Sequence, residues 1–199
     1  MRLFSVFCIA LMVSSALLHG QDKGDLAIGV NVMVGIRYDD IRMCVASPAG
    51  TPGGPVADVM LDLRYDFDEN TAVSFNLPVM RPILFAVAFD MLQFEPQFTF
   101  EQRFNINDDL DFVFGPGLGV SLHYGPDYKT AKDADNPEDF FAIGPNITSL
   151  FGINFNNESK LTRTIGLKAF YIPLFSSDYR KGTILGAALE GHFGFHAFD

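Results

Sequence analysis

The chain has 199 residues, of which 48% are hydrophobic, and a formal net charge of −10. A chain of this length fits one domain. Its excess of acidic residues disfavours nucleic-acid binding, which depends on Lys and Arg to meet the phosphates.

Residues 1–20 are predicted to be a secretory signal peptide. Arg2 supplies a short positive start, an apolar core follows, and small residues precede the expected cleavage point after Gly20. The apolar run is too short for a membrane-spanning helix. Cleavage would leave residues 21–199 as one domain with a net charge of −11, since Arg2 is the charged residue that is lost. Cys44 would remain, either as an inert loop thiol or as an intermolecular disulfide partner.

After residue 20, apolar residues recur at every second position in eight segments, which is typical of β-strands with one apolar face. The segments cover residues 26–38, 58–67, 72–79, 91–104, 110–124, 141–155, 165–171 and 185–195. The fifth segment contains "FGPGLGV" (114–120), where the alternation continues without a skip. A turn would break this register, so the stretch is predicted to lie within a strand.

The connections between the segments alternate in length. Short polar turns are predicted at residues 68–71, 105–109 and 156–159, and longer loops at about 39–55, 125–138 and 175–181. This is the pattern of an up-and-down meander whose two chain ends lie on the short-turn side. Residues 80–88, "MRPILFAVA", are apolar and fit neither kind of connection.

The chemistry of the two strand faces separates a membrane barrel from a soluble one. One face is rich in Gly, Ala and Ser, which suits the narrow lumen of a small barrel and has little use on a solvated surface. The other face is continuously apolar, with aromatic residues near strand ends as in the girdles of membrane barrels. These aromatics are Tyr38, Tyr65, Phe67, Phe104, Tyr124, Phe155 and Tyr171. The sequence predicts an all-β fold, an eight-stranded antiparallel up-and-down transmembrane β-barrel, with a lipocalin-like soluble barrel as the alternative.

Eight alternating segments behind a signal peptide, with "FGPGLGV" in the fifth, resemble the small eight-stranded outer-membrane β-barrel superfamily of double-membraned bacteria. This superfamily includes the OmpA-type transmembrane domain and the OmpX- and OmpW-like barrels. The resemblance covers residues 25–198 and implies that the chain lies in the outer membrane, in contact with lipid. Such barrels usually end in an aromatic residue; here Phe198 lies one position before the end, and Phe193 and Phe195 form an alternating aromatic pair.

Charged residues on the predicted lumen face are expected at one height. Counting from the outer strand ends places Asp62, Arg64, Glu95, Lys168 and Glu190 close to one layer. Because buried charges must be paired, these residues are predicted to form an ion network that plugs the barrel. The network is either a fixed set of salt bridges that stiffens the wall or a gate whose pairs exchange partners.

Toward the outer mouth, above this layer, the predicted lumen face becomes apolar. Its residues are Met33, Met60, Met80, Met91, Phe170, Ile172 and Ile184. An apolar funnel over a charged plug suits a small hydrophobic solute, although Met also serves as a filler beneath loops.

Three consecutive predicted strands carry a proline near mid-depth, namely Pro96, Pro116 and Pro145. Each proline removes one hydrogen-bond donor from the ladder, and hydrocarbon offers no water in its place. Either the seam between the fourth and sixth strands opens laterally, as the resemblance to OmpW-like barrels would allow, or three local bulges bend the wall.

No cofactor motif, metal-ligand spacing or Ser/His/Asp arrangement stands out, and His123, His192 and His196 are expected to be lumen or rim residues. An acyltransferase or protease barrel is the enzymatic alternative. Two non-enzymatic functions remain. The first is a narrow passive channel of porin type for small hydrophobic solutes. The second is a non-conducting structural or adhesin-like barrel that meets extracellular partners through loops 39–55 and 125–138.

Overall fold

The computed structural model describes residues 25–40, 52–87, 90–126, 139–155, 161–176 and 181–196. The predicted signal peptide, Cys44, most of the loops at 39–55 and 125–138, the turn at 156–159 and Phe198 lie outside these described residues.

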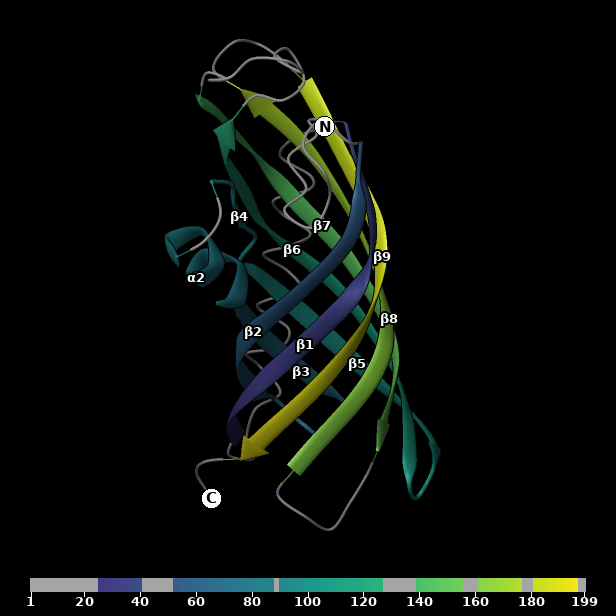
Figure 1. Ribbon diagram of the computed structural model, residues 1–199. Helices are drawn as coiled ribbons and strands as arrows, with labels where there is room; N and C mark the ends of the chain where they lie inside the picture. Colours follow the sequence, from purple (N-terminus) through teal and green to yellow (C-terminus); the bar gives the residue numbers. More distant parts are fainter. Residues whose placement is uncertain are drawn as a thin grey trace, which may run out of the picture.

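Strands make up most of the described chain, which contains a single helix (Figure 1). The elements are β1 (Asp25–Asp39), β2 (Gly54–Asp66), β3 (Thr71–Pro78), α2 (Met80–Val87), β4 (Leu92–Phe94), β5 (Gln97–Asn107), β6 (Leu110–Pro126), β7 (Asp139–Phe155), β8 (Leu161–Ser176) and β9 (Lys181–His196). Among the described residues, no helix is long and apolar enough to cross a membrane.

Neighbouring strands pair antiparallel, and the first strand, β1, also pairs with the last, β9, so the sheet closes into a barrel. Both β4 and β5 pair with β6 in one register, with Leu92 opposite Tyr124 and Gln97 opposite Gly119. The two short strands therefore occupy a single wall position. The result is an eight-stranded antiparallel up-and-down β-barrel, which confirms the predicted fold, and the "FGPGLGV" stretch lies inside β6 as expected.

Side chains alternate between lumen and exterior, and the predicted faces are confirmed. In β1, the inward residues Asn31 and Met33 are 4% and 5% exposed, whereas Val34 and Ile36 on the outward face are 60% and 71% exposed. The outward residues form a continuous apolar exterior, the lipid-facing band of a transmembrane barrel. It includes the predicted aromatics Tyr38, Tyr65, Phe104, Tyr124, Phe155 and Tyr171.

The short turns, the start of β1 and the end of β9 lie at the same end of the barrel, the lower end in Figure 1. Residues 67–70 connect β2 to β3, and residues 108–109 connect β5 to β6. At the same end, Ala27 near the start of β1 lies opposite His196 at the end of β9. In an up-and-down outer-membrane barrel the end with the short turns is the periplasmic end. We therefore call this end the periplasmic end and the opposite end the outer mouth.

The apolar stretch that fitted no predicted connection forms α2, because β3 stops short of the outer mouth. Pro78 ends β3 opposite Met60, whereas β2 extends six residues further toward the outer mouth, to Gly54. Pro78 cannot donate a ladder hydrogen bond, and after one further bond, from the N–H of Val79 to the carbonyl of Val59 at 2.9 Å, the chain leaves the sheet. A helix satisfies its own backbone groups and can therefore follow the strand without a pairing partner.

The missing upper part of β3 leaves an interruption of strand pairing, which we call the wall break. It is bounded by Gly54–Val59 of β2 on one side and by Leu92–Glu95, in and just after β4, on the other. Within the described residues, β4 pairs only with β6, and the β3–β5 ladder ends at Asn76 opposite Gln97. Figure 1 shows α2 on the side of the barrel where the wall break lies.

The three prolines do not shift the register of the seam between the fourth and sixth strands. Pro116 lies opposite Ser149 and Pro145 opposite Val120, in a β6–β7 ladder without register shifts. Pro96 separates β4 from β5, yet its carbonyl still accepts the N–H of Val120 at 3.1 Å. The register is the same on both sides of each proline. Ladder pairs are missing beside two of them, between Thr99–Gly117 and Gln102–Phe114 in β5–β6 and between Ile143–Phe175 and Ile147–Tyr171 in β7–β8. A lateral opening at this seam therefore stays a prediction, and the wall break is a longer interruption of strand pairing.

We predict that Gly119→Leu blocks folding. An added Cβ at Gly119 would lie 2.8 Å from the Cα of Gln97 and closer still to the carbonyl oxygen of Pro96, so the backbones of adjacent strands would have to separate. The measurement is the fraction of protein that reaches the heat-modifiable form on a gel after refolding in detergent. The control is Val120→Leu at the next position, whose side chain is outward and 44% exposed; equal folding of the two variants would contradict the prediction.

Candidate functional site

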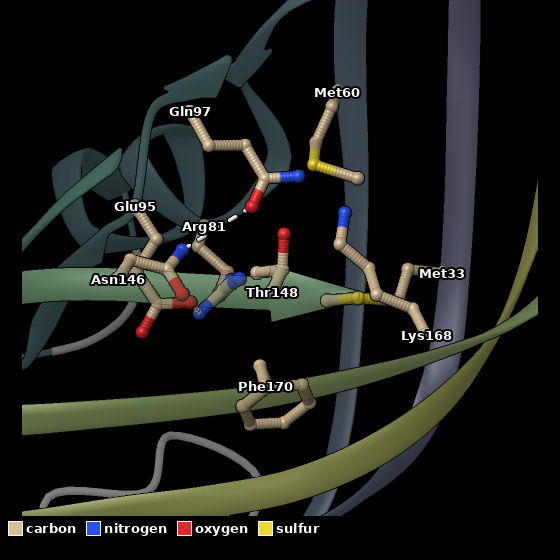
Figure 2. Close-up of a pocket in the computed structure, with 9 residues that line it drawn as sticks. All are labelled: Met33, Met60, Arg81, Glu95, Gln97, Asn146, Thr148, Lys168 and Phe170. Carbon is tan, nitrogen blue, oxygen red and sulfur yellow. Dashed lines mark hydrogen bonds and ion pairs between the residues drawn. The ribbon is translucent and has the colours of Figure 1, made fainter. Parts of the chain in front are cut away.

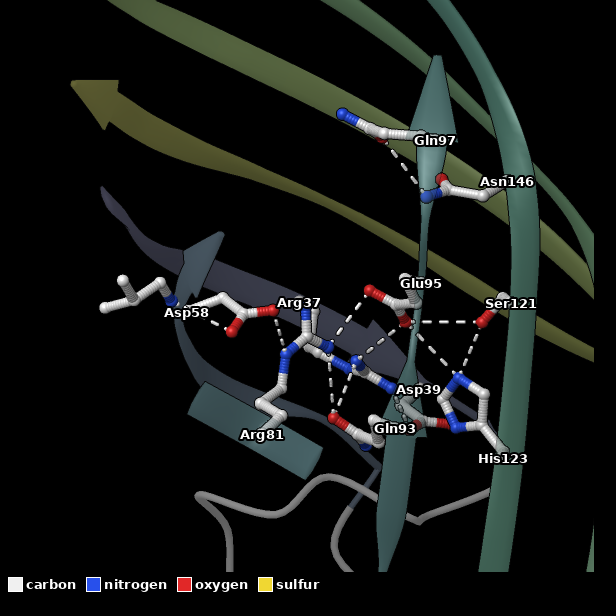
Figure 3. Close-up of polar contacts among 11 residues, drawn as sticks. Arg37, Asp39, Asp58, Arg81, Gln93, Glu95, Gln97, Ser121, His123 and Asn146 are labelled. Carbon is white, nitrogen blue, oxygen red and sulfur yellow. Dashed lines mark hydrogen bonds and ion pairs between the residues drawn. The ribbon is translucent and has the colours of Figure 1, made fainter. Parts of the chain in front are cut away.

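Charged and polar side chains fill the lumen beside the wall break (Figure 3). We call this set the upper ion cluster. Its members are Arg37 and Asp39 of β1, Asp58 of β2, Arg81 of α2, Gln93 of β4, Glu95, and Ser121 and His123 of β6. Every member is at most 8% exposed. The cluster therefore holds two guanidinium groups and three carboxylates away from bulk water, where each charge needs a partner.

Glu95 is the centre of the upper ion cluster. Arg81 Nη1 donates to Glu95 Oε2 at 3.0 Å, and Arg37 Nη1 lies 3.6 Å from Oε1. Ser121 Oγ donates to Oε1 at 3.3 Å, and His123 Nε2 lies at the same distance from that oxygen. One carboxylate thus connects side chains from β1, α2 and β6.

Arg81 joins the two sides of the wall break. Its Nε donates to Asp58 Oδ2 on β2 at 2.7 Å, and its Nη1 donates to Glu95 on the other side. Asp58 also accepts the N–H of Val59 through Oδ1 at 2.9 Å, at the height where β3 has already ended. Charge-assisted hydrogen bonds therefore replace strand pairing across this part of the wall.

A middle set of charged groups lies deeper in the lumen. Lys168 Nζ pairs with Glu190 Oε2 at 2.6 Å between β8 and β9. His192 Nε2 lies 3.1 Å from Asp62 Oδ2. His123 and His192 are thus lumen residues, as predicted from their positions on the strands.

A lower set lies toward the periplasmic end. Arg64 pairs with Glu101 at 2.8 Å and with Asp66 at 3.2 Å, and Arg103 also pairs with Asp66. Arg64 is fully buried and lies opposite Ala27 near the start of β1.

The five charged residues expected in one layer are all buried, but the structure divides them among these three sets. Glu95 belongs to the upper ion cluster, Arg64 to the lower set, and Asp62, Lys168 and Glu190 to the middle set. The strands of a barrel are staggered relative to one another and end at different heights. Counting from the outer strand ends therefore assigned residues of different depth to one height.

Most of the apolar residues expected at the outer mouth belong to two groups. Ile172 and Ile184 pack with Phe140, Ala142 and Leu174 on β7, β8 and β9, and Met91 packs against this group. Met33 and Met60 pack with Val56 and Ala188, and Phe170 contacts both groups. Met80 is the first residue of α2 and belongs to neither group. The mouth therefore has an apolar wall on β7, β8 and β9 and a second apolar group on β1, β2 and β9, rather than a ring-shaped funnel.

A small cavity separates the upper ion cluster from the middle set (Figure 2). Its volume is about 20 Å³, and its lining includes Met33, Arg81, Gln97, Lys168 and Phe170. This space holds about one water molecule and excludes an organic solute. This cavity by itself therefore offers no room for an organic solute.

Ser121, His123 and Glu95 do not have the geometry of a nucleophilic relay. Ser121 Oγ lies 2.9 Å from His123 Nε2, and Glu95 Oε1 contacts that same nitrogen. In a relay the acid orients the histidine through the other ring nitrogen, and Nδ1 of His123 has no hydrogen-bond partner among the described residues. The same part of the chain holds no set of three or more His, Cys, Asp or Glu side chains placed to bind a metal ion.

Sequence reasoning missed Arg81 and assigned no role to Arg37, Asp58 or Gln93. The last three lie on inward positions of alternating segments, so their burial could be inferred from the pattern. Arg81 belongs to a helix outside the alternation, and no sequence signal indicated that its side chain enters the lumen.

Comparison with known proteins finds the same fold in solved structures at low sequence identity. Neisserial surface protein A (NspA) is 8% identical and aligns over 88% of this chain and 99% of its own, with a TM-score of 0.56. Two structures of Ail, the attachment invasion locus protein of Yersinia pestis, align over 86% of this chain and 99% of their own. The first, in complex with the heparin analogue sucrose octasulfate, is 12% identical with a TM-score of 0.40. The second is 13% identical with a TM-score of 0.36. No protein-family model and no curated protein matches the sequence. The chain has the fold of a small eight-stranded outer-membrane β-barrel.

We predict that Glu95→Gln lowers the free energy of unfolding by about 3–5 kcal/mol, because removing one member of a buried ion pair leaves its partners uncompensated. The partners in this case are Arg37 and Arg81. Urea-induced unfolding of the barrel in lipid vesicles measures the change. The control is Glu69→Gln in the exposed turn between β2 and β3; equal changes in the two variants would show that the upper ion cluster does not stabilise the barrel.

Proposed function

We propose that this outer-membrane β-barrel is a non-enzymatic, passive conduit for small hydrophobic solutes, which it takes up at the outer mouth and releases sideways at the wall break. The observation that carries the proposal is the position of the wall break. It lies in the same outer half of the barrel as the buried apolar wall formed by Phe140, Ile172, Leu174 and Ile184. A hydrophobic solute would meet apolar contacts on one side and an interruption of the wall on the other.

A sideways route avoids the charged sets below. To move along the axis, a solute would have to separate the Lys168–Glu190 pair and then the contacts of Arg64. Each buried pair that is broken leaves uncompensated charges at a cost of several kcal/mol. At the wall break there is no backbone ladder to open, and the contacts of Arg81 with Asp58 and Glu95 are the polar links across it. Displacing α2 together with Arg81 would open this route.

A closed, non-conducting barrel is the second candidate function. It is favoured by the cavity of about 20 Å³, which admits no organic solute, and by buried ion pairs at three heights of the lumen. Such a barrel would act through surface contacts with extracellular partners. The loops at 39–55 and 125–138, which lie mostly outside the described residues, would supply these contacts.

We predict that Arg81→Met increases the uptake of a hydrophobic fluorescent probe into liposomes that contain the refolded barrel. Loss of the guanidinium removes the bridge between Asp58 and Glu95, and each lowering of the barrier by about 1.4 kcal/mol raises the rate about tenfold. The double variant Pro116→Val and Pro145→Val is the control, because both prolines lie in the unbroken β6–β7 ladder. Its uptake should equal that of the parent.

Asp58→Asn gives an independent test of the same bridge, and heat-modifiable gel migration verifies that each variant is folded. Uptake should increase in Asp58→Asn as it does in Arg81→Met. If no folded variant admits the probe and planar bilayers show no current, the conduit is refuted and the closed barrel is supported. If the double proline variant alone alters uptake, the route lies at the β6–β7 seam and not at the wall break.

A further inference from the structure

Helix α2 combines an inward-pointing charge with an exposed apolar surface. Arg81 is 4% exposed and reaches into the lumen, where it contacts Asp58 and Glu95. Ile83 and Val87 on the same helix are 59% and 73% exposed. A surface helix of a protein in water normally shows the reverse arrangement, with apolar residues inward and charged residues outward. The surroundings of α2 therefore differ from water.

The height of α2 identifies these surroundings. Along the wall break, Ala57 of β2 lies opposite Val34 of β1, and Pro55 lies opposite Ile36. Val34 and Ile36 belong to the lipid-facing band and are 60% and 71% exposed. The wall break thus interrupts the barrel within the apolar band, below the level at which the exterior would meet water.

Contacts of α2 with the barrel exterior make its surface continuous with this band. Phe85 packs edge to face against Tyr124, with ring centroids 6.2 Å apart. Tyr124 is one of the outward aromatics of β6 and lies opposite Leu92 of β4. The end of α2 that carries Phe85 therefore packs against the lipid-facing side of the wall, and the Arg81 side chain points into the lumen from the other end of the helix.

The backbone around the start of α2 is suited to a medium without water. The N–H of Val79 donates to the carbonyl of Val59 at 2.9 Å, and the N–H of Ile83 donates to the carbonyl of Val79 at 3.2 Å. Together with the Asp58 carboxylate on the N–H of Val59, these bonds satisfy backbone groups that a full-length β3 would have paired. Hydrocarbon tolerates irregular backbone only when its polar groups are satisfied within the protein.

From these observations we infer that the exposed face of α2, formed by Ile83 and Val87, is a lipid-binding surface that contacts the acyl chains of the outer leaflet. The helix replaces the missing top of β3 as the lipid-facing element, and Arg81 anchors it from the lumen. The inference does not depend on solute transport. A second copy of the chain covering the same face is the competing explanation.

The absence of tryptophan from the sequence makes single-tryptophan variants clean reporters of this surface. Ile83→Trp and Val87→Trp are refolded as the full barrel into phosphatidylcholine vesicles, and into vesicles of the same lipid with brominated acyl chains. Leu61→Trp, on the lipid-facing side of β2, is the control for acyl-chain contact. Asp68→Trp, in the exposed periplasmic turn, is the control for water.

We expect both α2 variants to show blue-shifted emission and to lose most of it in brominated vesicles, as Leu61→Trp does. Emission like that of Asp68→Trp, without quenching, would place α2 in water and overturn the inference. Blue-shifted emission that bromine does not quench would show that protein covers the helix, and would overturn it in favour of a second copy. No solute is involved, so the outcome is independent of the uptake experiment.

Discussion

A strand inside a bilayer has no water to complete its backbone hydrogen bonds, so every edge of the barrel wall needs a partner within the protein. Most of the wall meets this requirement through long antiparallel ladders. At the third position of the wall, β3 ends at Pro78, and among the described residues no strand pairs with the upper part of β2 on that side. In place of a longer β3, Val79 and the Asp58 carboxylate bond the carbonyl and the N–H of Val59, and the Arg81 side chain links the two sides of the wall break.

The same constraint explains how the lumen is organised. A barrel of eight strands is narrow enough for side chains to fill, and this one is filled by three sets of charges with an apolar wall beside the uppermost set. The charged side of the mouth faces the wall break, and the apolar side is formed by β7, β8 and β9. A hydrophobic solute would therefore meet an apolar surface on one side of the mouth and, on the other, the longest interruption of strand pairing among the described residues.

The alternation of residues was sufficient to predict the barrel. A shift of one residue in a strand would exchange its lumen and lipid faces, so the pattern fixes which side chains point inward. It placed Glu95, Lys168 and Arg64 correctly inside. It could not predict which charges meet, because pairing across the lumen depends on the stagger of strands that are distant in the sequence. The alternation ended the third segment at residue 79, close to the observed end of β3 at Pro78, but it did not show that the fourth segment gives no partner to the upper part of β2. Arg81 lies beyond that point in a helix, where alternation carries no information.

The order of the bridging residues along the chain bears on how the barrel assembles. Asp58, Arg81 and Glu95 all lie within one continuous stretch, residues 58–95, and the contacts among them involve no later strand. The two acids on either side of the wall break thus come from the same stretch of chain as the cation that links them. This bridge needs no counter-ion from β6–β9, so its formation does not depend on those strands being in place.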